Sequence, residues 1–180
     1  MTTDTHIRDL INRLARLDSA AGWEGDLNPT QRAMLGYLDR ANRFSRSPSH
    51  VSDYLGITRG TTTQSLKSLR QKGYVNERRS DIDKRVVSYD LTQTGREAAA
   101  IPAPLEESLS ALNASDQQAL RQLLQNMLQD ILAKNDGREF GLCKTCRHHR
   151  ERDRGPYCAL LDVALTRDEP HQICHEQVSA

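Results

Sequence analysis

All four cysteines of this 180-residue chain lie within its last 38 residues. They are Cys143, Cys146, Cys158 and Cys174, so the first two form a C-x-x-C pair. A C-x-x-C turn lets two thiolates bind the same ion, and two further thiolates complete a tetrahedral sulfur site. We therefore predict that these four side chains bind one metal centre, which is the cofactor of the protein.

Two kinds of metal centre suit this spacing. Structural Zn²⁺ sites usually use two short cysteine pairs, and here only the first pair is close. Iron–sulfur clusters accept one C-x-x-C pair with scattered further cysteines, and thiolates are their standard ligands. The stretch from 141 to 176 also resembles small cysteine-rich segments that hold a cubane cluster. An iron–sulfur cluster is the first expectation, Zn²⁺ the alternative, and four unlinked thiols the third reading.

Histidines in the same segment leave the ligand set open. His148, His149, His171 and His175 could each replace a cysteine or support one. The adjacent pair His148-His149 fits better in a solvated basic loop, because four arginines surround it in RHHRERDR. The segment contains few apolar residues, so it cannot bury enough surface to fold alone. A bound metal is expected to supply the missing stability.

The composition indicates a soluble protein of one domain with a small appendage. Hydrophobic residues make up 37% and charged residues 27% of the chain. No run approaches the ~18 apolar residues of a membrane span, and the N-terminus lacks the apolar core of a signal peptide. We expect a cytoplasmic protein with reduced thiols, which argues against disulfides. The net charge of +1 predicts no nucleic-acid partner by itself, but a local basic patch can still exist.

Apolar periodicity predicts a mainly α-helical fold. Residues 4–21 place leucine and isoleucine on one helix face, and Asn28-Pro29 is a typical start of a second helix. Asn113 caps a long helix to residue 134 with a wide aliphatic stripe. That stripe consists of Leu120, Leu123, Leu124, Met127, Leu128, Ile131 and Leu132. Both stripes are too apolar to face water, so they predict either a dimer interface or the core of the same domain.

The middle of the chain predicts a winged helix-turn-helix. Ser47-Pro48 opens a short helix that ends at Gly56, and Thr58 caps a longer helix that ends at Gly73. Two helices joined by a short glycine-containing turn are typical of a helix-turn-helix. Alternating residues then predict strands over 74–80 and 85–92. The expected fold class is therefore mainly α with a small β-hairpin wing.

The second helix of this pair is a candidate DNA reader. Its polar side chains could reach base edges and phosphates in the major groove, and a cationic hairpin suits the minor groove or the phosphates. For the helix alone, a solvated face would be the simpler interpretation; the adjoining turn and hairpin favour DNA. The predicted contacts are Arg59, Thr61, Thr62, Gln64, Ser65, Lys67, Arg70, Arg78, Asp83, Lys84 and Arg85.

From about residue 28 to 134 the chain resembles the MarR-type winged-helix regulators. The resemblance is carried by TQRAMLGYL, by VSDYLGITRGTTTQSLKSLRQKGYV and by the long C-terminal amphipathic helix. It also rests on Asp83-Lys84-Arg85, which stands eight residues before Leu91-Thr92-Gln93-Thr94-Gly95. The cysteine-rich segment lies beyond the usual boundary of this family. The N-terminal redox cysteine of some members has no counterpart here.

The resemblance implies a homodimer that binds a palindromic operator in double-stranded DNA. It implies that Arg85 enters the minor groove, oriented by Asp83, and that a small-molecule effector pocket lies between the dimer and DNA-binding regions. Repression is the more common outcome in the family. The expected divisions are an N-terminal dimerisation helix and linker (1–27), a winged helix-turn-helix (28–100), C-terminal dimerisation helices (101–136) and the metal-binding segment (137–180).

We therefore expect a transcriptional regulator whose operator binding is modulated by the iron–sulfur cluster, with the signal passing through the junction with helix 114–134. The first alternative is a regulator with a purely structural Zn²⁺ site that responds to a small molecule. The others are a protein-interaction module and a metal enzyme, neither of which binds DNA. An enzyme is disfavoured because four thiolates leave the metal no open position, and no Ser-His-Asp pattern or glycine-rich phosphate loop is present.

Overall fold

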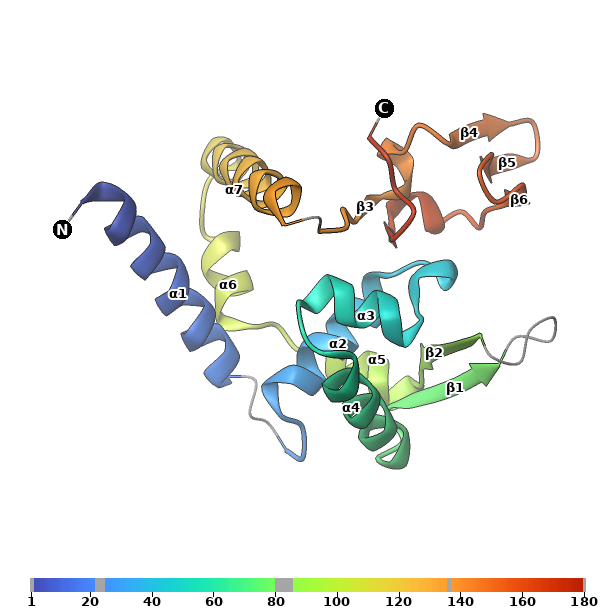
Figure 1. Ribbon diagram of the computed structural model, residues 1–180, viewed down its shortest axis with the longest axis horizontal. Helices are drawn as coiled ribbons and strands as arrows, with labels where there is room; N and C mark the ends of the chain where they lie inside the picture. Colours follow the sequence, from blue (N-terminus) through green and yellow to red (C-terminus); the bar gives the residue numbers. More distant parts are fainter. Residues whose placement is uncertain (1, 22–24, 80–85, 136, 180) are drawn as a thin grey trace.

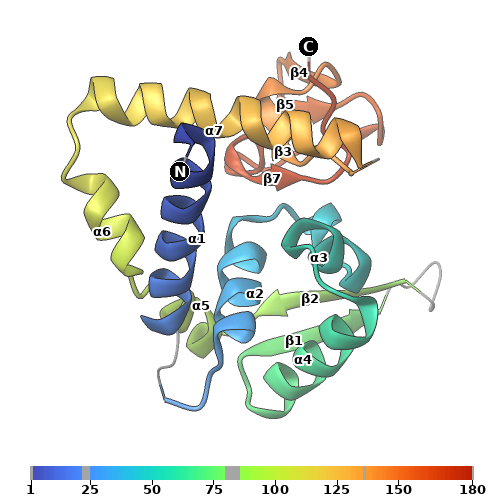
Figure 2. The same cartoon turned by 60° about the vertical axis from the view of Figure 1, so that its left-hand side comes forward.

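The computed structural model describes residues 2–21, 25–79, 86–135 and 137–179. A winged helix-turn-helix domain lies at its centre (Figure 1). Three helices, α1, α6 and α7, extend to one side of this domain, and the cysteine-rich segment packs near α3 (Figures 1 and 2). The mainly helical fold with a small antiparallel hairpin, expected from the sequence, is confirmed.

The winged domain contains four helices and two strands in the expected order. The hairpin is antiparallel, with Val75 opposite Leu91 and Arg79 opposite Val87. The first strand begins one residue later, and the second ends one residue earlier, than the alternating pattern predicts, and their other predicted ends, residues 80 and 85, lie outside the described residues. The elements are α2 (Pro29–Arg40), α3 (Pro48–Leu55), α4 (Arg59–Gln71), β1 (Val75–Arg79), β2 (Val87–Leu91) and α5 (Gln93–Ala99).

Local capping fixes where these helices begin and end. The side chain of Asn28 accepts a hydrogen bond from the backbone of Gln31, and the Gln31 side chain accepts one from the Asn28 backbone. Ser47 and Thr58 cap α3 and α4 in the same way through one side-chain oxygen each. Gly56 ends α3 in the left-handed conformation that glycine adopts without strain. The residues that predict these helix ends from the sequence therefore cap the helices in the structure.

The core of the winged domain forms where α2 crosses α3 and α4. Apolar side chains from all three helices and from the hairpin are buried there, so the recognition helix is held rigidly on the domain. The fully buried side chains include Met34, Leu35, Tyr37, Leu38, Val51, Leu66, Leu69 and Val75.

The Leu-Thr-x-x-Gly motif joins the wing to α5. Thr92 caps α5 by accepting a hydrogen bond from the Gly95 backbone, and its hydroxyl donates to the carbonyl oxygen of Gly73. Gly95 packs so closely on Tyr74 that a Cβ there would collide with the Tyr74 carbonyl oxygen. The motif therefore ties the end of α4, the hairpin and α5 together.

Helices α1 (Thr3–Ala21), α6 (Pro104–Ser110) and α7 (Ala114–Lys134) contain no buried residue. In α1, Leu14 and Leu17 are 49% and 58% exposed, and in α7 Leu123 and Leu128 are 61% and 55% exposed. The apolar stripes are thus not the core of this protomer, and that interpretation of the sequence is wrong. Among the residues that the structure describes, no helix has the length and apolarity needed to cross a membrane.

The cysteine-rich segment folds into short strands and 3₁₀ turns. These strands are too short to produce the alternating pattern that predicts strands from sequence. Strand β3 pairs with β7, and β5 lies between β4 and β6, all antiparallel. The elements are β3 (Gly141–Leu142), η2 (Cys143–Thr145), β4 (His149–Arg152), β5 (Gly155–Cys158), β6 (Val163–Ala164), η3 (Glu169–His171) and β7 (Ile173–Cys174).

Candidate nucleic-acid interface and thiol cluster

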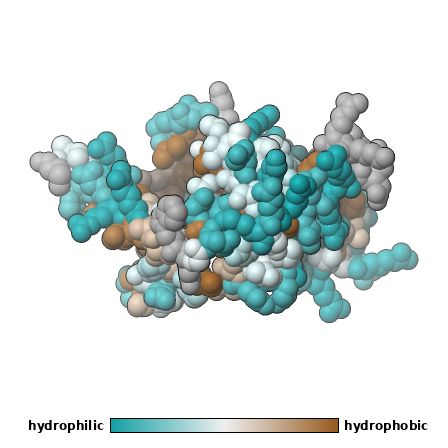
Figure 3. All heavy atoms as spheres, turned by 90° about the horizontal axis from the view of Figure 1, so that it is seen from below, coloured by the Kyte–Doolittle hydropathy of each residue, from teal (hydrophilic) through white to brown (hydrophobic). Residues whose placement is uncertain are grey.

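Helix α4 presents a polar face to the surface. Leu66 and Leu69 are fully buried, which turns the opposite side of the helix outward. The view from the α4 side shows a largely hydrophilic surface (Figure 3). Ser65 is half-buried, and the exposed side chains are Arg59, Thr61, Thr63, Gln64, Lys67, Arg70 and Gln71. Thr63 and Gln71 were not among the predicted contacts, although their spacing from Lys67 places them on the same face.

Thr62 is not on this face, and its predicted contact with DNA is wrong. The side chain is fully buried, and its hydroxyl donates to the carbonyl oxygen of Thr58 at 3.1 Å. Thr62 precedes Leu66 and Leu69 by four and seven residues, the spacing of one buried helix face. A polar residue at such a position can pack in a core when its hydroxyl bonds to the preceding turn.

The arginines on and beside the hairpin form ion pairs with carboxylate groups. Arg70 pairs with Glu77 at 2.6 Å, and Arg79 pairs with the same carboxylate at 3.1 Å. Burial acts to raise the pKa of Glu77, but the hydrogen bond from Arg79 and the charge of Arg70 outweigh it, so the pKa lies below its usual value. Arg78 pairs with Asp90 at 2.5 Å and remains 74% exposed. The ion pairs therefore orient these guanidinium groups, which remain accessible to a ligand.

The tip of the hairpin lies outside the described residues. It includes Asp83, Lys84 and Arg85, so their assigned roles at the minor groove stay predictions.

The four cysteines gather in one small domain. Cys143 and Cys174 are buried, whereas Cys146 and Cys158 are half-buried, and all four thiols are free. Burial, together with the charges of the other three cysteines, raises the pKa of Cys143 to about 12. The backbone N–H of Val178 donates to the sulfur of Cys146 at 3.5 Å. The thiols thus lie close enough to influence one another, and a shared cation would relieve the repulsion between their thiolates.

In this structure the four thiols are not arranged as a complete coordination site. Among the described residues, no three or more cysteine, histidine or acidic side chains converge closely enough to hold a metal ion as they stand. The chemistry of the donor set fits a thiophilic metal, and Cys143 already packs with Cys174 and Leu165 in one buried cluster. The metal and its ligand set stay predictions.

The histidine pair expected in a solvated loop lies instead at and before strand β4. His149 is paired with Cys158 across the strands, and its side chain is only 13% exposed. Its Nε2 atom is buried, lies 3.5 Å from the Glu151 carboxylate, and makes no hydrogen bond among the described residues. His149 therefore lies opposite Cys158 in the small sheet and not in a solvated loop, and a role beside the thiols stays a prediction.

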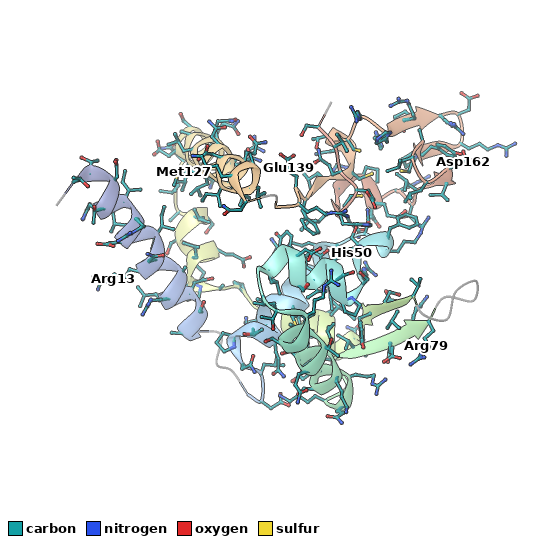
Figure 4. The ribbon with its side chains drawn as sticks, in the orientation of Figure 1. Arg13, His50, Arg79, Met127, Glu139 and Asp162 are labelled. Carbon is teal, nitrogen blue, oxygen red and sulfur yellow. The ribbon has the colours of Figure 1, made fainter. Side chains whose placement is uncertain are left out.

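The cysteine-rich segment packs directly on the winged domain. The buried Glu169 pairs with Arg43 at 2.8 Å. The ring of His175 stacks on that of His50 at 3.5 Å between centroids, and His50 lies where α3 faces this segment (Figure 4). The rings of Phe140 and Tyr54 meet edge-on, with 5.2 Å between their centroids. The cysteine-rich segment therefore contacts the winged domain directly, in addition to its expected connection through α7.

This arrangement, a helix-turn-helix followed by a two-stranded wing and flanked by long apolar helices, defines a winged helix-turn-helix protein. Residues 25–86 match the model of the MarR family. The transcriptional repressor MprA of Escherichia coli K12 is 29% identical over 110 residues, which cover 58% of this chain. The chain spans about 62% of the length of that relative. The winged part of the chain is therefore similar to the MarR family.

Solved structures show the same fold. FabT of Streptococcus pneumoniae in complex with DNA has a TM-score of 0.54 and 23% identity, covering 71% of this chain and 94% of FabT. MepR of S. aureus, also in a DNA complex, has a TM-score of 0.58 and 19% identity, covering 72% of this chain and 98% of MepR.

Proposed function

We propose that this protein is a homodimeric, DNA-binding transcriptional repressor whose operator affinity is modulated by a metal centre in its cysteine-rich segment. The observation that carries the proposal is the outward polar face of α4 beside the wing, in a fold shared with FabT and MepR, both solved with DNA. The name of MprA, a transcriptional repressor, supports repression as the outcome. On this proposal the protein is a regulator and not an enzyme.

The dimer follows from the uncovered stripes of α1 and α7. Side chains such as Leu17 and Leu128 are more than half exposed in the protomer, and a second copy can cover both stripes at once. Two-fold symmetry then presents two α4 helices to DNA. Such a pair fits a palindrome with half-sites separated by about 34 Å or a multiple of it.

The metal centre supplies the signal. We place an iron–sulfur cluster on Cys143, Cys146, Cys158 and Cys174; bound there, it would make the segment sensitive to oxidants, nitric oxide or iron scarcity. Zn²⁺ on the same thiolates would instead act as a structural clamp. In that case an effector would bind elsewhere. A hollow of about 270 Å³ between α1, α2, α5 and α6 is a candidate site.

The test has two arms. DNA binding is measured against salt concentration, since phosphate contacts give a steep dependence that a protein-interaction module lacks. Elemental analysis and an absorption spectrum of protein purified without oxygen identify the metal. Iron together with sulfide would support the iron–sulfur cluster, and zinc alone would support the structural Zn²⁺ site. Protein without any metal would overturn both assignments. Absence of salt-dependent DNA binding would overturn the regulator itself.

A further inference from the structure

A polar cleft of about 680 Å³ lies between the hairpin, the connector from α2 to α3 (residues 41–46) and the cysteine-rich segment. Its volume falls within the usual range of ligand sites, but its lining is cationic instead of apolar. Gln172 brings the cysteine-rich segment to the cleft. The winged domain contributes four arginines from three of its parts: Arg43 and Arg46 of the connector, Arg78 of β1 and Arg96 of α5.

The hairpin has two faces, and Arg78 lies on the face turned away from α4. Side chains alternate along a strand, so Glu77 and Arg79 share one face and Arg78 belongs to the other. Glu77 pairs with Arg70 of α4 at 2.6 Å, which identifies its face as the α4 side. Arg78 instead pairs with Asp90 and lines the cleft. The outward face of α4 therefore does not account for the exposed charge of Arg78.

Contacts within the protein orient the arginines of the cleft but leave an excess of positive charge. Asp90 pairs with Arg78 at 2.5 Å and with Arg46 at 2.8 Å, so one carboxylate serves two guanidinium groups. Arg46 and Arg96 also donate to backbone carbonyl oxygens, at 2.8 and 3.0 Å, which carry no full charge. Among the described residues, Asp39 is the other acidic residue in the lining. A guanidinium group has five N–H donors, more than these contacts use.

We propose that this cleft binds a small polyanion, a molecule with at least two phosphate or carboxylate groups. The planar fork of a guanidinium group matches both kinds of group in bidentate geometry. Asn76, Ser88 and Gln172 add amide and hydroxyl groups to the lining, which suit hydroxyl groups of the same ligand. A bound polyanion contacts the hairpin, the connector and the cysteine-rich segment at once. The site needs neither a metal nor a second copy, because one protomer provides all of these residues.

The test is calorimetric titration of the full-length protein with pyrophosphate and, separately, with citrate at constant ionic strength. Arg78→Gln removes one guanidinium group from the cleft, and the side chain is 74% exposed, so the fold should stay intact. Arg96→Gln removes a second one, from a different element. Arg79→Gln is the matched control, because Arg79 is the next residue of the same strand, is 65% exposed and lies on the α4 side.

We expect Arg78→Gln and Arg96→Gln each to weaken binding of the polyanion by roughly tenfold or more, the usual effect of losing a hydrogen bond between charged groups. Arg79→Gln should bind the polyanion like wild type. Binding of pyrophosphate but not citrate, or the reverse, would support the site and identify the acidic group that it prefers.

Absence of binding to wild type, or equal losses in Arg78→Gln and Arg79→Gln, would overturn the inference. Loss of pyrophosphate and citrate binding when duplex DNA is bound would assign these arginines to the DNA backbone and overturn it as well. Each of these failures leaves the proposed DNA binding through α4 standing, because no α4 residue lines the cleft.

Discussion

At the scale of single residues, the position of a side chain on the helix decides whether it can contact DNA or packs in the core. Thr62 and Lys67 lie on the same polar helix, yet Thr62 is fully buried and Lys67 is exposed. The hydroxyl of Thr62 can bond to the preceding turn, whereas an ammonium group needs water or an anion. The DNA-binding role proposed for α4 therefore depends on a few outward side chains.

Lys67→Gln should weaken DNA binding about equally for all sequences. If each Lys67 of a dimer contacts one phosphate, the slope of log affinity against log salt should fall by about 2, at ~0.9 per contact. Fluorescence anisotropy over a salt series measures this slope. Lys134→Gln removes an exposed lysine at the end of α7 and should leave the slope unchanged. Equal slopes for Lys67→Gln and wild type would exclude the phosphate contact.

Gly95→Ala should destabilise the winged domain. The added methyl group meets the Tyr74 carbonyl oxygen, so backbone must move, at a cost of about 1–3 kcal/mol. Gly36→Ala is the matched control, because nothing lies within 4 Å of its Cβ position in helix α2. That change should stabilise the protein by roughly 0.5–1 kcal/mol. Urea unfolding measures both, and a neutral Gly95→Ala would contradict the close packing of α5.

At the scale of elements, the cysteine-rich segment and α3 meet through the rings of His50 and His175. Burial, with smaller contributions from the neighbouring His175 and Arg138, lowers the pKa of His50 to about 4 against the opposite effects of Asp53 and Glu176. The folded protein therefore favours neutral His50. This stability is complete above the usual histidine pKa of 6.5 and is lost as the pH falls from 6.5 toward 4.

His50→Phe should remove that part of the acid sensitivity. Phenylalanine keeps an aromatic ring against His175 but cannot bind a proton. Urea unfolding at pH 7 and pH 5 should show a smaller loss of stability for the variant than for wild type. Between pH 7 and pH 8, His50 is neutral in the folded chain and mostly neutral in the unfolded chain, so the difference between the proteins should change little there. An unchanged acid sensitivity would show that His50 is not a site of this linkage.

At the scale of the whole molecule, the apolar stripes of α1 and α7 are uncovered in the protomer. Leucine and isoleucine side chains on both helices are exposed in the protomer, and on the proposed function a second copy covers them. Association through α1 and α7 leaves the α4 face uncovered, since that face lies on another side of the winged domain (Figure 2).

Leu128→Glu should convert the proposed dimer into a monomer with weakened DNA binding. The side chain is 55% exposed in the protomer, so the charge costs little in the folded monomer but is desolvated in the dimer. Light scattering after size exclusion gives the mass, and Gln122→Glu on the same helix is the control for added charge. A dimeric Leu128→Glu protein would place the interface elsewhere.

Much of the fold is readable from sequence because it depends on local rules. Caps such as Asn28 and Thr58 act within one turn of the chain, and the helix period follows from backbone geometry. Most of the exposed residues of α4 were found in the same way, but Thr63 and Gln71 were missed and Thr62 was wrongly included. The burial of Thr62 depends on the packing of α4 against other elements of the domain, which residues distant in the sequence provide.

The sequence by itself determined the helix-turn-helix, the wing, the apolar stripes and a set of four cysteines, since each is a pattern of neighbouring residue types. Only the tertiary structure decided that the stripes are uncovered in the protomer and that the cysteine-rich segment docks on the connector beside α3. Asn42 lies 131 residues before Ile173 in the chain and no periodicity relates them, yet the Asn42 backbone N–H donates to the carbonyl oxygen of Ile173 at 2.9 Å. Their contact arises from packing between separate parts of the chain, where the burial of apolar surface brings remote polar groups together.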